Sequence, residues 1–143
     1  KRAQIRGKDV GFVFQSFHLM PRLTALDNVM LPLEISGDPQ SIDKAYEALK
    51  QVGLSNRAKH FATQLSGGEK QRVAIARSIV NKPKILFADE PTGNLDKKSS
   101  SSITDLIFSL NELLQTTLVL VTHDLSLAEK CDEVYELSEG QLL

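Results

Sequence analysis

The sequence has little cysteine, little net charge and no long apolar run, and each shortage excludes a class of protein. The single cysteine, Cys131, excludes an internal disulfide, and we interpret it as a packing residue. No apolar stretch approaches the roughly 20 residues that cross a bilayer, and no charged-then-apolar signal segment opens the chain. The net charge is −1 at pH 7, so the overall charge does not attract nucleic acid, and we expect no nucleic-acid partner.

The chain nevertheless has the size and apolar content of a folded domain. It contains 143 residues, and 41% of them are hydrophobic, which is enough to build a core. Short apolar runs are separated by longer stretches with helical periodicity, which favours an α/β class built on a parallel sheet. Any role at a membrane would have to be exercised through a partner.

Residues 85–96 are the stretch on which the functional interpretation depends. Residues 85–88 form an apolar run too short for a helix, which is typical of a parallel strand buried on both faces. Asp89 and Glu90 follow at once, and Pro91 ends the strand, so both carboxylates are expected at the sheet edge where α/β proteins bind ligands. This is the Walker B pattern, in which the Asp holds Mg²⁺ and the adjacent Glu polarises a water. The alternative is a strand that ends in two solvated acids.

A second apolar run, residues 10–14, predicts another strand and ends at Gln15. A neutral amide at that place can contact both Mg²⁺ and an attacking water, or it can simply satisfy backbone groups at the strand end. Residues 17–20 then place large apolar groups in a loop before Pro21. Exposed groups of this kind are typical of a docking site for a partner.

The following residues, up to residue 62, predict three helices, each beginning at a hydroxyl that can accept a hydrogen bond from a free backbone N–H. Proline disfavours helix in the residue before it, so the first helix is expected to end near Pro32. The expected helices begin at Thr24, Ser41 and Ser55, and the second and third end at Val52 and Ala62.

Ser66 begins a further helix that continues to Val80 and has two glycines in its first turn. A helix N-terminus offers unpaired N–H groups and partial positive charge, and glycine lets an anion approach the backbone, so Gly67 and Gly68 suit a phosphate. The carboxylate of Glu69 either interacts favourably with the positive end of the helix dipole or contacts a ribose hydroxyl. An ordinary glycine-rich helix start is the alternative.

The last part of the chain completes the expected half-sheet. The serines at 99–102 are interpreted as the first turn of a helix that continues through an apolar stripe to Leu114, and residues 117–121 predict a third buried strand. His123 follows that strand and is expected at the same edge as Glu90. A short helix over residues 126–130, a strand over 133–138 and a turn into residues 141–143 are expected after it.

In this order the motifs resemble those of the ATP-binding subunit of ABC transporters. The resemblance covers essentially the whole chain, and the sequences of residues 10–17, 28–33 and 88–96 are similar to those of the lipoprotein-releasing and macrolide-export branch. It implies a P-loop NTPase-like (RecA-like) α/β fold with a helical signature subdomain, incomplete at its N-terminus. The matches are Gln15 (Q-loop), residues 65–69 (signature), 85–90 (Walker B), 93–96 (D-loop) and His123 (switch histidine).

The resemblance also implies a role for individual residues, with ATP and Mg²⁺ as the ligands. Gln15 and Asp89 would coordinate Mg²⁺, and Gln15 would sense the membrane partner. Glu90 would be the general base, and His123 would contact the γ-phosphate or orient the water. The residues implied to bind ATP, largely across the interface with an opposite subunit, are Ser66, Gly67, Gly68, Glu69 and Asp96, the last also coupling the two sites.

Partners and location are implied in the same way. The family's subunits work as head-to-tail dimers with two ATPs between them, so the expected partners are a second nucleotide-binding subunit and transmembrane permease subunits that contact residues 17–31. The expected location is the cytoplasmic face of the inner membrane, and the expected process is export or lipoprotein release.

One motif of the family does not occur in the sequence. A P-loop requires Gly-x-x-x-x-Gly-Lys-Ser/Thr, and no such string is present. We therefore expect the later portion of one nucleotide-binding domain, inactive alone. Its unpaired sheet edges are expected to pair with another copy or to be covered by swapping. Its expected parts are residues 1–20 (Q-loop strand and loop), 21–80 (helical subdomain) and 81–143 (Walker B, D-loop and H-loop half).

Two other classes of ABC-type ATPase are alternatives to a transporter subunit. DNA-repair and chromosome ATPases share the signature and Walker B, but they insert a long coiled coil between Q-loop and signature. The segment between Gln15 and Ser66 is short and has no sustained heptads. A soluble translation-type ABC protein would carry two cassettes. A segment of one cassette is compatible with that alternative, which therefore stays open.

Overall fold

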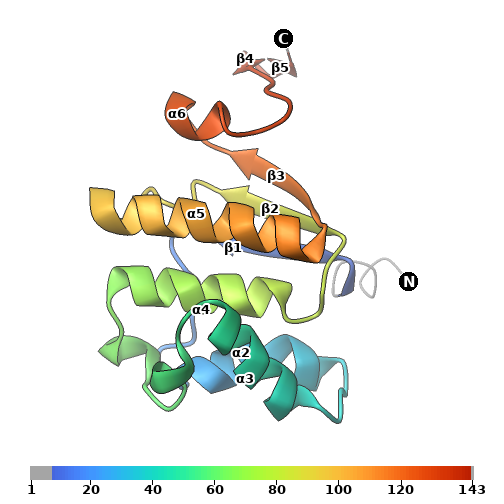
Figure 1. Ribbon diagram of the computed structural model, residues 1–143, viewed down its shortest axis with the longest axis vertical. Helices are drawn as coiled ribbons and strands as arrows, with labels where there is room; N and C mark the ends of the chain where they lie inside the picture. Colours follow the sequence, from blue (N-terminus) through green and yellow to red (C-terminus); the bar gives the residue numbers. More distant parts are fainter. Residues whose placement is uncertain (1–7, 143) are drawn as a thin grey trace.

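The computed structural model describes residues 8–142, so residues 1–7 of the expected Q-loop strand and loop (residues 1–20), and Leu143, lie outside the described residues. At its centre is a three-stranded parallel sheet in the order β1-β2-β3 (Figure 1). Phe14, Asp89 and Val121 are aligned in register, so all three strands end at the same edge. The strands are β1 (Val10–Phe14), β2 (Ile85–Asp89) and β3 (Thr117–Val121), as the sequence predicted.

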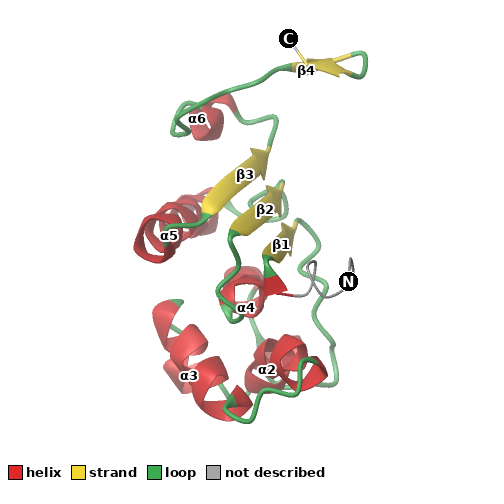
Figure 2. Cartoon of the chain, turned by 90° about the vertical axis from the view of Figure 1, so that its right-hand side faces the viewer, coloured by secondary structure: helices red, strands yellow, loops and turns green. Residues whose placement is uncertain are grey.

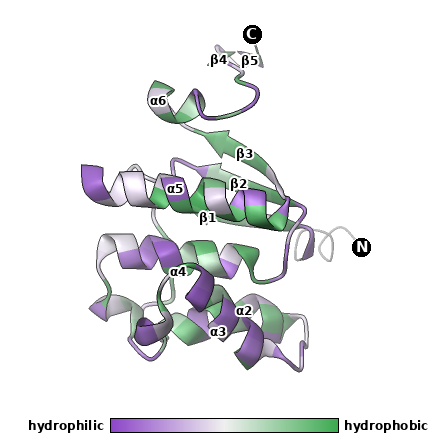
Figure 3. Cartoon of the chain, in the orientation of Figure 1, coloured by the Kyte–Doolittle hydropathy of each residue, from purple (hydrophilic) through white to green (hydrophobic). Residues whose placement is uncertain are grey.

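Helices cover one face of the sheet, whereas the short helix that follows β3 lies beyond the edge of the sheet (Figure 2). α4 (Gly67–Ile79) packs on β1 and against α5 (Lys97–Leu114), and α2 (Ala25–Ile35) and α3 (Ser41–Gln51) pack on α4. α4 is therefore central, and its apolar residues Val73, Ile75 and Ala76 are fully buried. In Figure 3 the strands are hydrophobic, whereas hydrophilic residues gather on the outer turns of the helices.

The expected helix starts are partly confirmed. Thr24 and Asp27 form a reciprocal capping box at the start of α2, which continues through Pro32 to Ile35. Ser41 is the first residue of α3 rather than its cap, because Gln40 occupies the cap position and makes no capping bond. The single helix expected over residues 55–62 is wrong: two 3₁₀ turns, η1 (Ser55–Arg57) and η2 (Ala62–Gln64), take its place.

β1 and β2 are buried on one face only, which corrects the expectation of burial on both. β3 has no buried residue, so the expectation of a third buried strand is wrong: β3 is an edge strand whose inward residues are only partly covered. Val13, Leu86 and Ala88 point into the helical layer and are buried. Side chains alternate along a strand, so their neighbours lie on the other face, which no described element covers (Figure 2). That face carries Phe12 (43% exposed), Phe14, Phe87, Val119 and Val121, with Phe12 stacked on both other phenylalanines.

The chain beyond β3 differs from expectation. α6 (Leu125–Ala128) forms, but the strand expected over residues 133–138 is wrong, because residues 133–136 are irregular. Instead β4 (Leu137–Ser138) and β5 (Gln141–Leu142) make a two-stranded hairpin. Glu139 and Gly140 both have positive φ, the conformation that tight two-residue hairpin turns need.

A buried glutamine joins the helical layer to the ligand-facing edge of the sheet. Gln71 of α4 is fully buried, and its Nε2 donates to Phe14 O at 3.2 Å and to Pro91 O at 2.5 Å. These carbonyls belong to the chain at the ends of β1 and β2. Its Oε1 has no hydrogen-bond partner among the described residues, so the side chain is held by its donors alone.

We expect Gln71→Met to lower the free energy of unfolding by about 2 kcal/mol. The buried carbonyl of Pro91 loses its side-chain donor and the partly buried carbonyl of Phe14 loses one of its two donors, while the side-chain volume is nearly kept. Urea unfolding measures the change. Gln40→Met, at an exposed position without a capping bond, is the matched control and should change stability little. Equal stabilities of the two variants would contradict a stabilising role for the Gln71 hydrogen bonds.

We also expect this chain to bind a hydrophobic dye through the uncovered sheet face, because stacked phenylalanines are exposed there. Phe12→Ser should reduce the dye fluorescence clearly. Ile42→Ser, which removes an exposed apolar residue from α3, should reduce it little. Equal reductions would place the dye elsewhere.

Candidate functional site

The residues expected to act on a ligand follow the three strands at their common edge. Gln15 follows β1, Asp89 ends β2 with Glu90 directly after it, and His123 lies two residues beyond β3. The parallel register Phe14–Asp89–Val121 brings these four positions to one edge, as expected. Asp89 is exposed there, so its carboxylate is accessible to a ligand.

Glu90 is held by the chain that follows β3. Its backbone has φ of 45°, a region that side-chain-bearing residues seldom adopt, and its N–H donates to Val121 O at 2.8 Å. The carboxylate Oε1 lies 2.7 Å from Nδ1 of His123 and accepts the backbone N–H of His123 at 3.0 Å. Thr122 donates its hydroxyl to Oε2 at 3.4 Å. Glu90 and His123 therefore form a directly bonded acid–imidazole pair.

This pairing raises the pKa of His123 above its ordinary value of 6.5. The hydrogen bond from Glu90 is the main cause, the charge of Glu90 adds to it, and a smaller contribution comes from Asp124. The His123 side chain is 86% exposed, so its second ring nitrogen remains accessible to a ligand. The pair can thus hold or pass a proton near neutral pH.

Gln15 is bonded to the loop that follows Glu90. Its Nε2 donates to Oδ1 of Asn94 at 3.1 Å, and Nδ2 of Asn94 donates to Gln15 O at 3.0 Å. The side chain also lies against Gly93, where a Cβ would come within 2.6 Å of Nε2. The loops after β1 and β2 are therefore locked to each other at this edge.

The apolar loop after Gln15 is anchored from two helices. Arg77 of α4 donates to Phe17 O at 3.0 Å and to His18 O at 2.8 Å, and both of these residues have positive φ. Burial of its guanidinium lowers the pKa of Arg77. Asn28 of α2 is fully buried and bonds both backbone groups of Met20, whose side chain is 51% exposed. The loop is thus fixed while it exposes Met20, whereas Phe17 and Leu19 are partly buried and Leu19 packs against the core.

The start of α4 has the expected cap, with a fuller set of bonds. Ser66 accepts the N–H of Glu69 on its hydroxyl, and Glu69 accepts the N–H of Ser66 at 2.9 Å. The other oxygen of Glu69 accepts from Nε of Arg57 at 3.1 Å. The bond from Ser66 is the main cause that lowers the pKa of Glu69, and Arg57 adds to it. This geometry favours a capping role for Glu69 over contact with a ribose.

The glycines of α4 face the loop that leads into α5. A Cβ on Gly67 would lie 3.5 Å from Leu95, and one on Gly68 would lie 3.4 Å from Ser99. Asp96 caps α5 through the N–H and hydroxyl of Ser99, and the N–H bond is the main cause that lowers its pKa. The structure therefore places the residues expected to act on a ligand in two groups, one at the sheet edge and one at the starts of α4 and α5.

The sequence analysis missed four residues that hold these groups in place: Gln71, Arg77, Asn28 and Asn94. Gln71 and Asn28 are polar residues within the periodic apolar faces of their helices, and that break in the pattern was the available signal. Arg77 and Asn94 bond to chain distant in sequence, so no local pattern marks them.

The acids and amides at the edge fit Mg²⁺ only in part. Among residues 8–142, no group of three or more His, Cys, Asp or Glu side chains could hold a metal ion. Mg²⁺ prefers one or two carboxylates together with waters and substrate phosphates to an all-protein cage. The carboxylate of Asp89 and the amide oxygen of Gln15 supply ligands of this kind, so the donor set fits Mg²⁺ delivered with a nucleotide.

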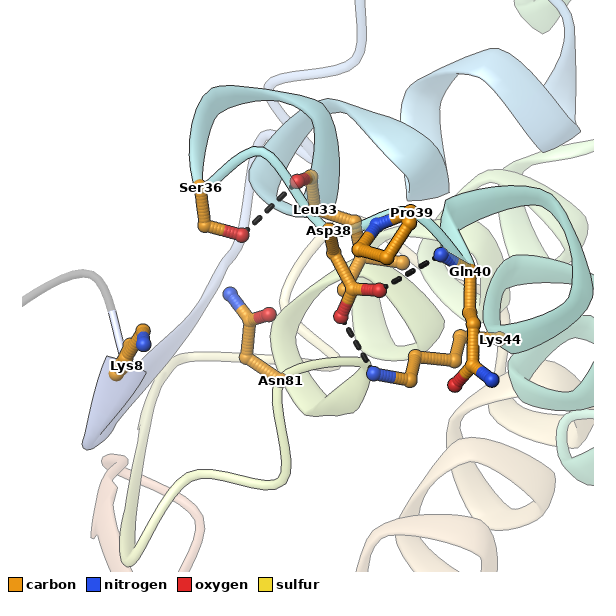
Figure 4. Close-up of a pocket in the computed structure, with 8 residues that line it drawn as sticks. All are labelled: Lys8, Leu33, Ser36, Asp38, Pro39, Gln40, Lys44 and Asn81. Carbon is orange, nitrogen blue, oxygen red and sulfur yellow. Dashed lines mark hydrogen bonds and ion pairs between the residues drawn. The ribbon is translucent and has the colours of Figure 1, made fainter.

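A separate pocket of about 480 Å³ lies away from this edge (Figure 4). It is formed where α2 meets α3, near the amino ends of β1 and β2. Asp38 stands at its centre, accepts the N–H of Gln40 and pairs with Lys44. Asp38 and Lys44 thus pair within the pocket, Lys8 adds a second positive charge to its lining, and none of the residues expected to act on a ligand lines it.

Comparison with known proteins identifies the family. The sequence pattern of the ABC transporter family matches residues 1–93 of the chain. The chain belongs to the ABC transporter family. It is 54% identical over 143 residues to the ABC transporter ATP-binding protein YbbA of Escherichia coli (strain K12), and this match takes in 99% of the chain and 63% of YbbA.

Other relatives agree with the family. The lipoprotein-releasing system ATP-binding protein LolD of Xanthomonas campestris pv. campestris (strain 8004) is 49% identical, over 99% of the chain and 60% of LolD. The dimeric post-hydrolysis structure of the ATP-binding cassette MJ0796 bound to ADP and Pi has a TM-score of 0.84 and 42% identity, covering 98% of the chain and 63% of that cassette.

These matches confirm the P-loop NTPase-like α/β class for the chain. The chain spans less than two thirds of the length of these relatives. Within residues 8–142, no helix combines the length and apolarity needed to cross a membrane.

The acid–imidazole pair can be tested by titration. We expect the imidazole of His123 to titrate above pH 6.5, and Glu90→Gln to move its midpoint down towards that value, because the main cause of the raised pKa is lost. The charged pair is complete below pH 6.5 and is lost as pH rises through the folded-state pKa. NMR of the ring protons measures this, with His123→Gln assigning the resonance.

Asp124→Asn is the matched control, since Asp124 contributes least to the shift, and it should move the midpoint less than Glu90→Gln does. A midpoint that stays in place in Glu90→Gln would contradict the pairing.

Proposed function

We propose that the protein is the ATP-binding subunit of an ABC transporter, which couples ATP binding and hydrolysis to movement of transmembrane partners. The observation that carries this proposal is the convergence of Gln15, Asp89, Glu90 and His123 at one sheet edge in a chain of this family. The names of the relatives YbbA and LolD support an ATP-binding role in transport.

In this proposal the edge residues act on the phosphates and the attacking water. Mg²⁺ bound with ATP would neutralise charge on the phosphate oxygens. Asp89 and the amide oxygen of Gln15 bind that ion. Glu90 takes the proton of the water, since its carboxylate is the base at the edge, and His123 orients Glu90 through the 2.7 Å contact and presents its other nitrogen to the γ-phosphate.

The residues at the start of α4 bind a second nucleotide. Ser66, Gly67 and Gly68 offer the hydroxyl and the first N–H groups of a helix to the γ-phosphate of an ATP held mainly by an opposite subunit. Glu69 orders this turn through its cap, and Asp96 couples the two sites from the start of α5. A head-to-tail dimer is supported by the dimeric cassette structures with which the chain aligns.

The partner surface in this proposal is the segment 17–31. It contains the loop that Arg77 and Asn28 hold, including the exposed Met20. Such a fixed apolar surface suits a helix of a permease subunit, and a subunit bound in this way would lie on the cytoplasmic face of the inner membrane. By likeness to LolD, lipoprotein release or export is the process served.

The test is Glu90→Gln in the intact subunit. We expect ATP turnover to fall at least about a hundredfold, the size expected for loss of a general base, while ATP binding measured by calorimetry and ATP-dependent dimerisation measured by light scattering remain. Glu112→Gln, an exposed acid on α5, is the matched control and should leave turnover unchanged.

Undiminished hydrolysis in Glu90→Gln would overturn the assignment of the general base. Absence of ATP binding by the intact wild-type subunit would overturn the proposed function itself.

A further inference from the structure

The loop residue Asn94 has no role in the function proposed above, yet its side chain is hydrogen-bonded to that of Gln15. It accepts Nε2 of Gln15 on its Oδ1 at 3.1 Å and returns a bond from its Nδ2 to Gln15 O at 3.0 Å. An asparagine can satisfy both demands at once because its amide carries an acceptor and donors side by side.

These two bonds determine which end of the Gln15 amide remains available. Nε2 is engaged by Asn94, whereas Oε1 accepts no hydrogen bond from any of the residues 8–142. A metal cation binds the oxygen of a side-chain amide and is repelled by its NH₂ group. The observed orientation is therefore the one in which Gln15 can be a metal ligand.

Gly93 supplies an independent constraint on the same side chain. A Cβ at this position would lie 2.6 Å from Nε2, 2.8 Å from Cδ and 3.2 Å from Cγ of Gln15. The side chain of Gln15 thus lies flat against the backbone of the loop, and only glycine leaves that space. The loop after Glu90 is shaped to receive Gln15 both by hydrogen bonding and by contact.

We propose that Asn94 is a positioning residue, which orients the Gln15 amide so that Oε1 faces the Mg²⁺ that accompanies ATP. The inference rests on the proposed function. The inference adds that the loop after Glu90 influences the metal through Gln15. The segment between β2 and α5 would then supply the metal-binding Asp89, the base Glu90 and Asn94, which orients the amide that follows β1.

A contact that only holds the two loops together would give the same hydrogen bonds, so the test must measure metal binding. In the intact subunit carrying Glu90→Gln, which prevents turnover, Mn²⁺ binding in the presence of saturating ATP is measured by electron paramagnetic resonance. We expect Asn94→Ala to weaken Mn²⁺ binding about fivefold, the size expected when one hydrogen bond is lost, with little change in ATP affinity measured without divalent cation.

A double-mutant cycle separates the proposal from a general structural effect. In a Gln15→Ala background, Asn94→Ala should weaken Mn²⁺ binding no further, because the amide that it orients is gone. Asn56→Ala, at an exposed position of η1, is the matched control and should leave Mn²⁺ binding unchanged.

Gly93→Ala is the second variant, which displaces the Gln15 side chain while leaving Asn94 in place, and it decides the question if Asn94→Ala does not fold. It should also weaken Mn²⁺ binding, and the Gln15→Ala background should again remove the effect. Unchanged Mn²⁺ binding in these variants, or an effect that persists without the Gln15 amide, would overturn the inference and leave the proposed function standing. Failure of the Glu90→Gln parent subunit to bind ATP would instead count against the proposed function.

Discussion

The bonds of the buried Gln71 amide are the interaction on which the arrangement of the site depends. Gln71 belongs to α4, whose first turn carries Ser66 and the two glycines, and its Nε2 holds the backbone at the ends of β1 and β2. Those ends deliver Gln15 and Glu90. The bond to Pro91 O is buried and the bond to Phe14 O is partly buried, and leaving such partners unpaired is costly. Together with the packing of α4 on β1 and α5, this side chain therefore holds the two groups of ligand-facing residues in their relative position.

Most of the groups proposed to act on ATP already serve the fold in this structure. The hydroxyl of Ser66 and the carboxylate of Asp96 cap helices, Glu69 is bonded to Arg57, and Glu90 is bonded to His123. Binding a nucleotide therefore means exchanging existing bonds for new ones. Groups that are held in this way lose little conformational entropy when a ligand arrives, which is the advantage of a preorganised site.

The sequence was sufficient where structure is determined by neighbouring residues. β1 and β3 have the predicted bounds, the serines at 99–102 are the first turns of α5, and Thr24 and Ser66 cap their helices as predicted. The sequence was insufficient where the structure is determined by contacts between residues distant in the chain. Apolar alternation cannot reveal that one sheet face is uncovered, and neither the loop anchors Arg77 and Asn94 nor the hairpin β4–β5 follow from local periodicity. The strand bounds and caps were thus predictable, whereas the contacts that align the site were not.

The strand order has a kinetic meaning. β2 pairs with β3 across a short crossover that contains only α5, but with β1 across the whole helical region. Closing the longer loop costs more chain entropy before any pairing repays it. During folding, β2, α5 and β3 should therefore assemble first, an order that pulsed hydrogen exchange would reveal. Gln15 would then be the last of the edge residues to reach its native position, after α4 has packed on the sheet and β1 has paired with β2.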